Sequence, residues 1–204
     1  MMAPVKTASN TEYRTPTPQG PAQRNPDQNL PSNFSKSSGV TFSRVSVPGP
    51  YVALTFDDGP HASNTPRLLD ILRARNVKAT FYVIGKNVDM YPGIVRRTVA
   101  EGHEIGNHTY NHPKLSALGT DRVMSEIRRT DEAIFKASGV RPKTLRPPYG
   151  ALLQSQRQMI HSTFGYPTIM WSVDPQDWRR PGVAAVTSRL VNGAHPGAIM
   201  LSHD

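Results

Sequence analysis

Residues 51–60 read YVALTFDDGP, an apolar run that stops abruptly at two carboxylates. The run is continuous rather than alternating, which predicts a strand buried on both faces, as in a parallel sheet. Gly59 and Pro60 end the strand in a turn, so Asp57 and Asp58 can approach one pocket instead of pointing to opposite faces. Carboxylates at the end of such a strand lie where α/β barrels build active sites. The same four residues are also typical of an ordinary surface turn.

A second polar stretch reads HTYNH at residues 108–112 and places His108 four residues before His112. Asn107 and Pro113 are atypical of a helix interior, so we expect the two histidines at a strand end and in a turn. Such spacing also arises by chance in a chain with seven histidines. Together with the two carboxylates, however, the imidazoles provide oxygen and nitrogen ligands for one divalent cation and a spare base. The combination predicts metal-assisted hydrolysis.

Apolar strands alternate with amphipathic helices along the rest of the chain. We expect strands within residues 40–47 and at 51–56, 78–84, 104–107, 144–146, 168–173 and 198–202. We expect helices at 66–75, 92–101, 121–137, 154–164 and 183–191. Thr65 before Pro66 predicts a helix N-cap. The alternation favours a parallel sheet, closed or nearly closed into a barrel. Polar clusters follow five of the strands, so one rim should collect them in a catalytic pocket.

Composition divides the chain in two. Residues 1–39 are rich in Pro, Ser, Thr, Asn and Gln, with almost no large apolar side chains, which predicts a disordered N-terminal linker or tail. Residues 40–204 then form the folded domain. The first six residues lack the apolar core of a signal peptide, and no run reaches transmembrane length. The absence of cysteine excludes disulfides and thiolate ligands.

The chain is basic, with a formal net charge of +9 and a pI of about 10.1. The arginines and lysines are dispersed over the predicted helices and form no long run or aromatic-interleaved stripe. Solvated helix faces explain them best, with weak attraction to an anionic polymer as the alternative. We therefore expect no nucleic-acid partner.

Five motifs resemble those of the polysaccharide deacetylases of the NodB-homology type, carbohydrate esterase family 4. They occur in family order from Tyr51 to Asp204, at residues 55–59, 108–112, 146–150, 174–178 and 201–203. The resemblance implies an α/β fold, a distorted (β/α) barrel of the NodB deacetylase type, over residues 40–204. Relatives usually continue with another helix and strand after the fifth motif. We therefore expect a domain that is C-terminally incomplete and lacks its last helix and strand.

The resemblance also implies a metal centre. Asp58, His108 and His112 would bind a divalent metal, with zinc expected and cobalt or nickel as alternatives. Asp57 would be the general base that takes a proton from metal-bound water, which attacks the acetyl carbonyl. Arg146 would hold Asp57 ionised and oriented, although beside two prolines it is also compatible with a surface ion pair.

The remaining motifs imply the acid and the acetyl pocket. His203 would be the general acid that protonates the departing amine, with Asp174 tuning its pKa. The backbone N–H of Tyr149 would stabilise the oxyanion. Trp178 and Leu201 would line a small apolar pocket for the acetyl methyl, although both are also compatible with core positions, and Tyr149 with a simple turn.

The expected function is metal-dependent hydrolysis of N-acetyl groups of an N-acetylated polysaccharide, either peptidoglycan or a chitin-like chain. The alternatives are an O-acetyl xylan esterase of the same family and a catalytically silent carbohydrate-binding relative. Two histidines and a carboxylate also form the ligand set of non-haem iron oxygenases, but the strand–helix alternation argues against their antiparallel scaffold. By resemblance we expect export to the cell envelope or beyond.

Overall fold

The structure is a computed structural model that describes residues 40–204. The tail predicted for residues 1–39 lies outside the described residues. The described strands are β1 (Thr41–Phe42), β2 (Val52–Asp57), β3 (Thr80–Val83), β4 (Glu104–Asn107), β5 (Thr168–Ile169) and β6 (Ala198–His203). The α-helices are α1 (Asn64–Ala74), α2 (Gly85–Met90), α3 (Pro92–Ala100), α4 (Thr120–Ser138), α5 (Gln154–Phe164) and α6 (Val183–Gly193). Short 3₁₀ turns lie at η2 (Leu115–Ala117), η3 (Pro148–Gly150) and η4 (Asp177–Arg179).

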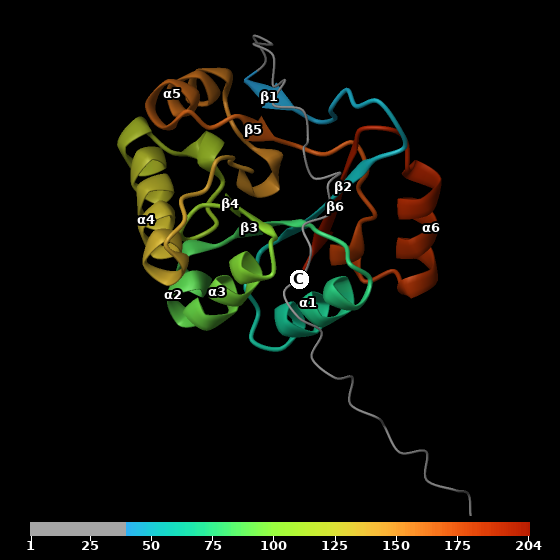
Figure 1. Ribbon diagram of the computed structural model, residues 1–204. Coiled ribbons are helices and arrows are strands. Elements are labelled where there is room, and N and C mark those ends of the chain that lie inside the picture. Colours follow the sequence, from blue (N-terminus) through green and yellow to red (C-terminus); the bar gives the residue numbers. More distant parts are fainter. Residues whose placement is uncertain (1–39) are drawn as a thin grey trace, which may run out of the picture. The chain divides into compact units, whose positions relative to one another are not determined.

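A four-stranded parallel sheet carries the motifs. Its order is β4-β3-β2-β6, so the strand with the two carboxylates lies inside the sheet (Figure 1). The register places Asp57 of β2 beside His203 of β6 and Val83 of β3 beside Asn107 of β4. Because parallel strands end at the same edge, these positions gather the first, second and fifth motifs at one rim. The predicted parallel α/β arrangement is confirmed.

The regular ladder is open between β4 and β6, and single-residue bridges lie across this gap. Leu145 bridges Asn107 on one side and Thr168 on the other, and Val173 bridges Met200. The strand predicted at residues 144–146 is therefore reduced to one bridge, and β5 is shorter than predicted because pairing stops after Ile169. β1 pairs in parallel with β5.

Helices pack on the sheet through apolar stripes. One core cluster joins β3 and β4 to α1, α2, α3 and α4, with Leu69, Phe81, Val95 and Ile134 at its centre. A second cluster lies between α4 and α5, around Leu145. The long helix α4 ends at Gly139, whose φ of 76° is the left-handed conformation that glycine accommodates without strain.

Two details differ from the sequence prediction. Helix α1 begins at Asn64 with Ser63 before it, so Thr65 is inside the helix and buried rather than the N-cap. The Thr65 hydroxyl accepts the His61 N–H at 2.7 Å, a tertiary contact that capping statistics do not anticipate. Helix α2 was not predicted, because its six residues are too few to show a helical period.

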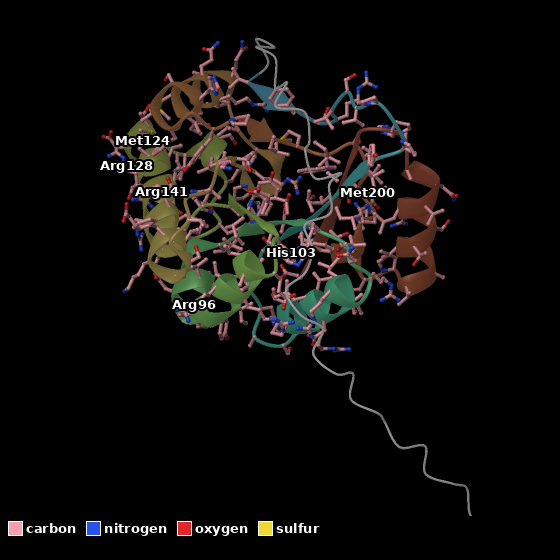
Figure 2. The ribbon with its side chains drawn as sticks, in the orientation of Figure 1. Arg96, His103, Met124, Arg128, Arg141 and Met200 are labelled. Carbon is pink, nitrogen blue, oxygen red and sulfur yellow. The ribbon has the colours of Figure 1, made fainter. Side chains whose placement is uncertain are left out.

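Among the described residues, basic side chains of the helices lie on the periphery, as predicted. Figure 2 places Arg96 on α3 and Arg128 and Arg141 on and just beyond α4, away from the sheet, and all three are exposed. In residues 40–204 no helix combines the length and the apolar character needed to cross a bilayer.

Candidate active site

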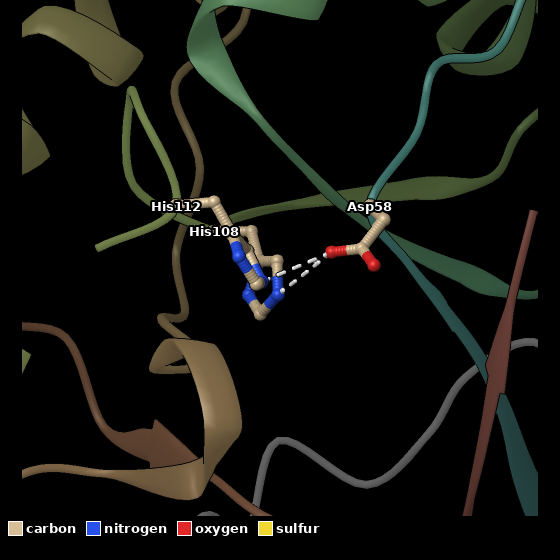
Figure 3. A group of neighbouring side chains, drawn as sticks. All are labelled: Asp58, His108 and His112. Atoms are coloured by element: carbon tan, nitrogen blue, oxygen red, sulfur yellow. Dashed lines mark ion pairs between the residues drawn. The ribbon is translucent and has the colours of Figure 1, made fainter. Parts of the chain in front are cut away.

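The three predicted metal ligands converge at the rim. The Nε2 atoms of His108 and His112 lie 3.4 and 3.2 Å from Oδ1 of Asp58 (Figure 3). One possible ligand atom from each residue lies within 4.8 Å of the other two. Asp58 follows β2 and His108 follows β4, so the parallel register itself brings these two together. His112 lies in the turn beyond, with φ at 60°, as the sequence predicted.

The protonation of His108 suits ligation. Its Nδ1 lies 2.7 Å from the carbonyl oxygen of Arg146, which can only accept a hydrogen bond. Nδ1 therefore carries a hydrogen, and Nε2 is the ring atom that faces Asp58 and is available to a metal. Burial alone would raise the pKa of Asp58, but contacts with His108 and His112 outweigh burial and hold it well below its usual range. Two imidazoles and an ionised carboxylate are a donor set that fits zinc or a similar divalent ion.

Asp57, the last residue of β2, lies beside this cluster. It is buried, and its Oδ2 lies 3.8 Å from Nε2 of His108. Nη1 of Arg146 donates to Oδ1 of Asp57 at 2.7 Å and to the hydroxyl of Thr55 at 2.7 Å. The predicted pairing of Arg146 with Asp57 is therefore present, and Arg146 is a fully buried residue rather than a surface one.

The Arg146 guanidinium has further partners besides Asp57 and Thr55. Its Nε and Nη2 donate to the carbonyl oxygens of Ile169 and Met170 at 3.1 and 3.0 Å. The ring of Tyr82 lies 4.2 Å from the guanidinium carbon, a cation–π distance. A Cβ at Gly106 would strike that ring, so the absence of a side chain there lets Tyr82 lie against Arg146. Sequence reasoning did not find Tyr82, which looked like one more apolar position of a buried strand.

His203 ends β6 beside Asp57, but its carboxylate partner differs from the prediction. Asp177 accepts from Nδ1 of His203 at 2.8 Å and from the His203 backbone N–H at 2.8 Å. Asp174 is exposed and accepts the backbone N–H of Gln176 instead. Gln176 has a φ of 55°, and this turn carries Asp177 rather than Asp174 to the ring. The motif contains both carboxylates, and the sequence prediction chose Asp174, the wrong one.

Contact with Asp177 favours the protonated form of His203. Burial alone would lower the pKa of His203, but the hydrogen bond and charge of Asp177 outweigh it and raise the pKa above its ordinary value. The same pair lowers the pKa of Asp177, against the effect of burial. An imidazolium at the rim can donate a proton to a leaving group.

The three predicted substrate-binding residues lie in different surroundings. Leu201 is buried in β6, two residues before His203. Trp178 is 57% exposed, and the Arg179 guanidinium lies 4.6 Å from its ring. Tyr149 is 70% exposed, has a φ of 60°, and its ring lies edge-on to His112 with centroids 4.8 Å apart.

Comparisons with known proteins all match the chain to the same kind of protein. The family model described as polysaccharide deacetylase matches residues 44–169. Peptidoglycan-N-acetylglucosamine deacetylase PgdA of Listeria monocytogenes is 45% identical over 153 residues, which are 75% of this chain and 32% of that protein. The chain thus spans about a third of that relative's length.

Two further matches cover more of the other protein. A chitooligosaccharide deacetylase of Bradyrhizobium is 44% identical over 154 residues, 75% of this chain and 70% of that protein. The crystal structure of the Bc1960 peptidoglycan N-acetylglucosamine deacetylase superposes with a TM-score of 0.79 at 37% identity, covering 82% of this chain and 78% of that one. This likeness confirms the predicted fold class.

Proposed function

The chain belongs to the polysaccharide deacetylase family, and on that premise we propose that it hydrolyses N-acetyl groups of a polysaccharide at the rim formed by β2, β4 and β6. The main support for the proposal is that three groups of residues lie together at this rim. Asp58, His108 and His112 form a ligand set, Asp57 is a carboxylate held by a buried arginine, and His203 is an imidazole held by a carboxylate.

Asp58, His108 and His112 would hold the metal, for which zinc is our first choice because the set has two nitrogens and one oxygen. Cobalt and nickel accept the same ligands. Bound there, a divalent ion would supply Lewis acidity, which would polarise the acetyl carbonyl and lower the pKa of water to about 7.

Asp57 would take the proton from the attacking water. Nη1 of Arg146 donates to Oδ1 of this carboxylate and orients it, while Oδ2 lies toward His108. A separate donor must then protonate the amide nitrogen, since an amine anion is a very poor leaving group. His203 would be this donor, because Asp177 raises its pKa and orients its ring. One water adds across the amide, so the products are acetate and a free amine.

The neighbouring residues would position the sugar. The backbone N–H of Tyr149 is our candidate for stabilising the oxyanion, because the resemblance to the family implies this role and the Tyr149 ring lies against His112. Leu201 and Trp178 would contact the acetyl methyl and the sugar ring. We assign Asp174 no role here, because its carboxylate accepts a hydrogen bond from its own turn and Asp177 pairs with His203 instead.

The substrate we propose is peptidoglycan or a chitin-like oligomer, the classes named for the matched relatives. Such polymers lie at or beyond the cell envelope, so we also propose that the protein acts there. Its dispersed positive charge would favour an anionic wall polymer at low salt.

The test is acetate release from chitin oligomers, peptidoglycan and acetylated xylan by the whole chain. Each assay would use wild type and Asp57→Asn, with zinc or cobalt returned after chelator treatment. Release from an N-acetylated substrate that requires the metal and is lost in Asp57→Asn supports the proposal, and the best substrate identifies the class.

Two results would overturn the proposal. Release from xylan alone would make the protein an O-acetyl esterase of the same family. Binding of oligosaccharide without acetate release from any substrate, by a protein loaded with metal, would make it a silent carbohydrate-binding relative.

A further inference from the structure

The loop that contains His108 and His112 has two residues in an unfavourable backbone conformation. Thr109 has a φ of 67° and His112 a φ of 60°, both in the left-handed region. This region is unfavourable for any side chain and especially for a β-branched one such as Thr109. Such a conformation persists only where surrounding contacts enforce it. The contacts that enforce it therefore also set how far apart the two imidazoles lie.

Backbone contacts hold the first half of the loop. Oδ1 of Asn107 accepts the N–H of Thr109 at 2.8 Å. The N–H groups of Gly85 and Lys86, at the start of α2, donate to the carbonyl oxygens of Thr109 and Tyr110 at 2.9 and 3.1 Å. These bonds fix the chain near His108 but reach no further than Tyr110.

In the second half of the loop the His112 N–H donates to Oγ1 of Thr109 at 3.1 Å, and Glu126 of α4 accepts hydrogen bonds from the two residues between them. One carboxylate oxygen accepts the backbone N–H of Tyr110 at 2.9 Å and that of Asn111 at 2.7 Å. The other oxygen accepts Nδ2 of Asn111 at 2.8 Å. All three donors belong to the two residues that lie between Thr109 and His112.

Burial of the Glu126 carboxylate would be unfavourable without these hydrogen bonds. Glu126 is only 6% exposed, and within residues 40–204 no cationic side chain lies within ion-pair distance of its carboxylate. A buried charge without a counter-charge is costly unless its hydrogen-bonding capacity is used. The N–H groups of residues 110 and 111 use the hydrogen-bonding capacity of the Glu126 carboxylate.

We propose that Glu126 is a positioning residue for the metal centre, which holds residues 110–111 and thereby sets the separation of His108 and His112. The inference rests on the proposed metal-binding role of these histidines. Glu126 does not contact the metal or the substrate; it acts through the backbone, as residues beyond the direct ligands commonly do in metal sites.

The test compares four forms of the whole chain by zinc affinity, measured by competition with a chelator. Glu126→Ala removes all three acceptors, and we expect affinity to fall by about 10- to 100-fold. Glu126→Asp keeps the charge but shortens the reach, so it should lose affinity too. Glu126→Gln keeps an oxygen for the two backbone N–H groups, and a rotated Asn111 amide can pair with its NH₂, so it should keep most of the affinity.

A second readout avoids the metal altogether. In the metal-free protein the amides of Tyr110 and Asn111 should exchange slowly with deuterium in wild type and Glu126→Gln. They should exchange much faster in Glu126→Ala. If Glu126→Ala fails to fold, the Asp and Gln variants carry the same comparison, because both keep a polar side chain on α4.

The matched control is Ile134→Ala, which weakens the packing of α4 at a fully buried apolar position two turns further on. It should lower stability but keep zinc affinity and slow exchange at residues 110–111. Wild-type affinity in Glu126→Ala, or an equal loss in Ile134→Ala, would overturn the inference. So would a pattern that follows charge, with Asp normal and Gln as weak as Ala. Acetate release by wild type would stand in each of these cases, so failure here is distinct from failure of the proposed function.

Discussion

The site has two sides that are built differently. The ligand side consists of Asp58, His108 and His112, and the acid side consists of Asp177 and His203. On the ligand side, His108 is buried, and its loop is fixed by bonds from β4, α2 and α4. On the acid side, His203 is held through the single carboxylate of Asp177, and the neighbouring Trp178 is more than half exposed. Metal ligation requires fixed distances, whereas a proton donor and a sugar contact tolerate adjustment. We expect substitutions on the ligand side to affect metal and fold, and those on the acid side to affect pH dependence and substrate binding.

The largest effect should come from Asp58→Ala. It removes the only carboxylate of the ligand set within the described residues, so bound zinc and acetate release should both fall to background. Metal analysis of the purified protein, with an activity assay, checks this. Retained zinc would show that the three residues are not the ligand set.

Arg146→Met comes next, because it affects the fold as well as the chemistry. The substitution leaves Asp57 buried without its partner, and breaking such a pair costs about 3–5 kcal/mol of unfolding free energy. Arg141→Met breaks an exposed pair with Glu132 and should cost at most about 1 kcal/mol. Urea unfolding measures both. Equal costs would contradict the buried role assigned to Arg146.

Asp177→Asn should change the pH profile. The carboxylate raises the pKa of His203, so its removal lowers that pKa, and His203 loses its proton at a lower pH. The basic limb of kcat/KM should move to lower pH, and kcat should fall by no more than the roughly 10²–10⁴-fold typical of general acid catalysis. Asp174→Asn is the matched control and should leave the profile unchanged. A shift caused by Asp174→Asn alone would restore the original sequence prediction.

The smallest effect on the fold should come from Trp178→Ala. An exposed side chain contributes little to folding, so the unfolding free energy should stay within about 0.5 kcal/mol of wild type. KM for the oligosaccharide should rise if the indole contacts the sugar. Steady-state kinetics and urea unfolding together separate the two effects. An unchanged KM would leave Trp178 without a role in binding.

Much of the fold could be predicted because apolar periodicity is a local property. Strand β4 and helix α5 have the predicted bounds, and the ends of β2 and β6 are within one or two residues. The misses have tertiary causes. Helix α2 is too short to show a period, and the pairing of residues 144–146 depends on neighbours far along the chain.

The site divides in the same way. The ligand residues could be named because a turn after a strand places them at a shared rim. The choice between Asp174 and Asp177 depends on the left-handed turn at Gln176, which no spacing rule predicts. Tyr82 and Glu126 carry no motif of their own, because their contributions consist of contacts with residues 64 and 15–16 positions away.

The most direct test of the central claim is a titration of zinc into chelator-treated protein, followed by acetate release from an N-acetylglucosamine oligomer. The account predicts that release is absent without metal, rises in proportion to added zinc and saturates at one zinc per chain in wild type. His112→Ala should not respond over the same range. Release that persists without metal, or that His112→Ala supports equally well, would contradict a catalytic centre at Asp58, His108 and His112.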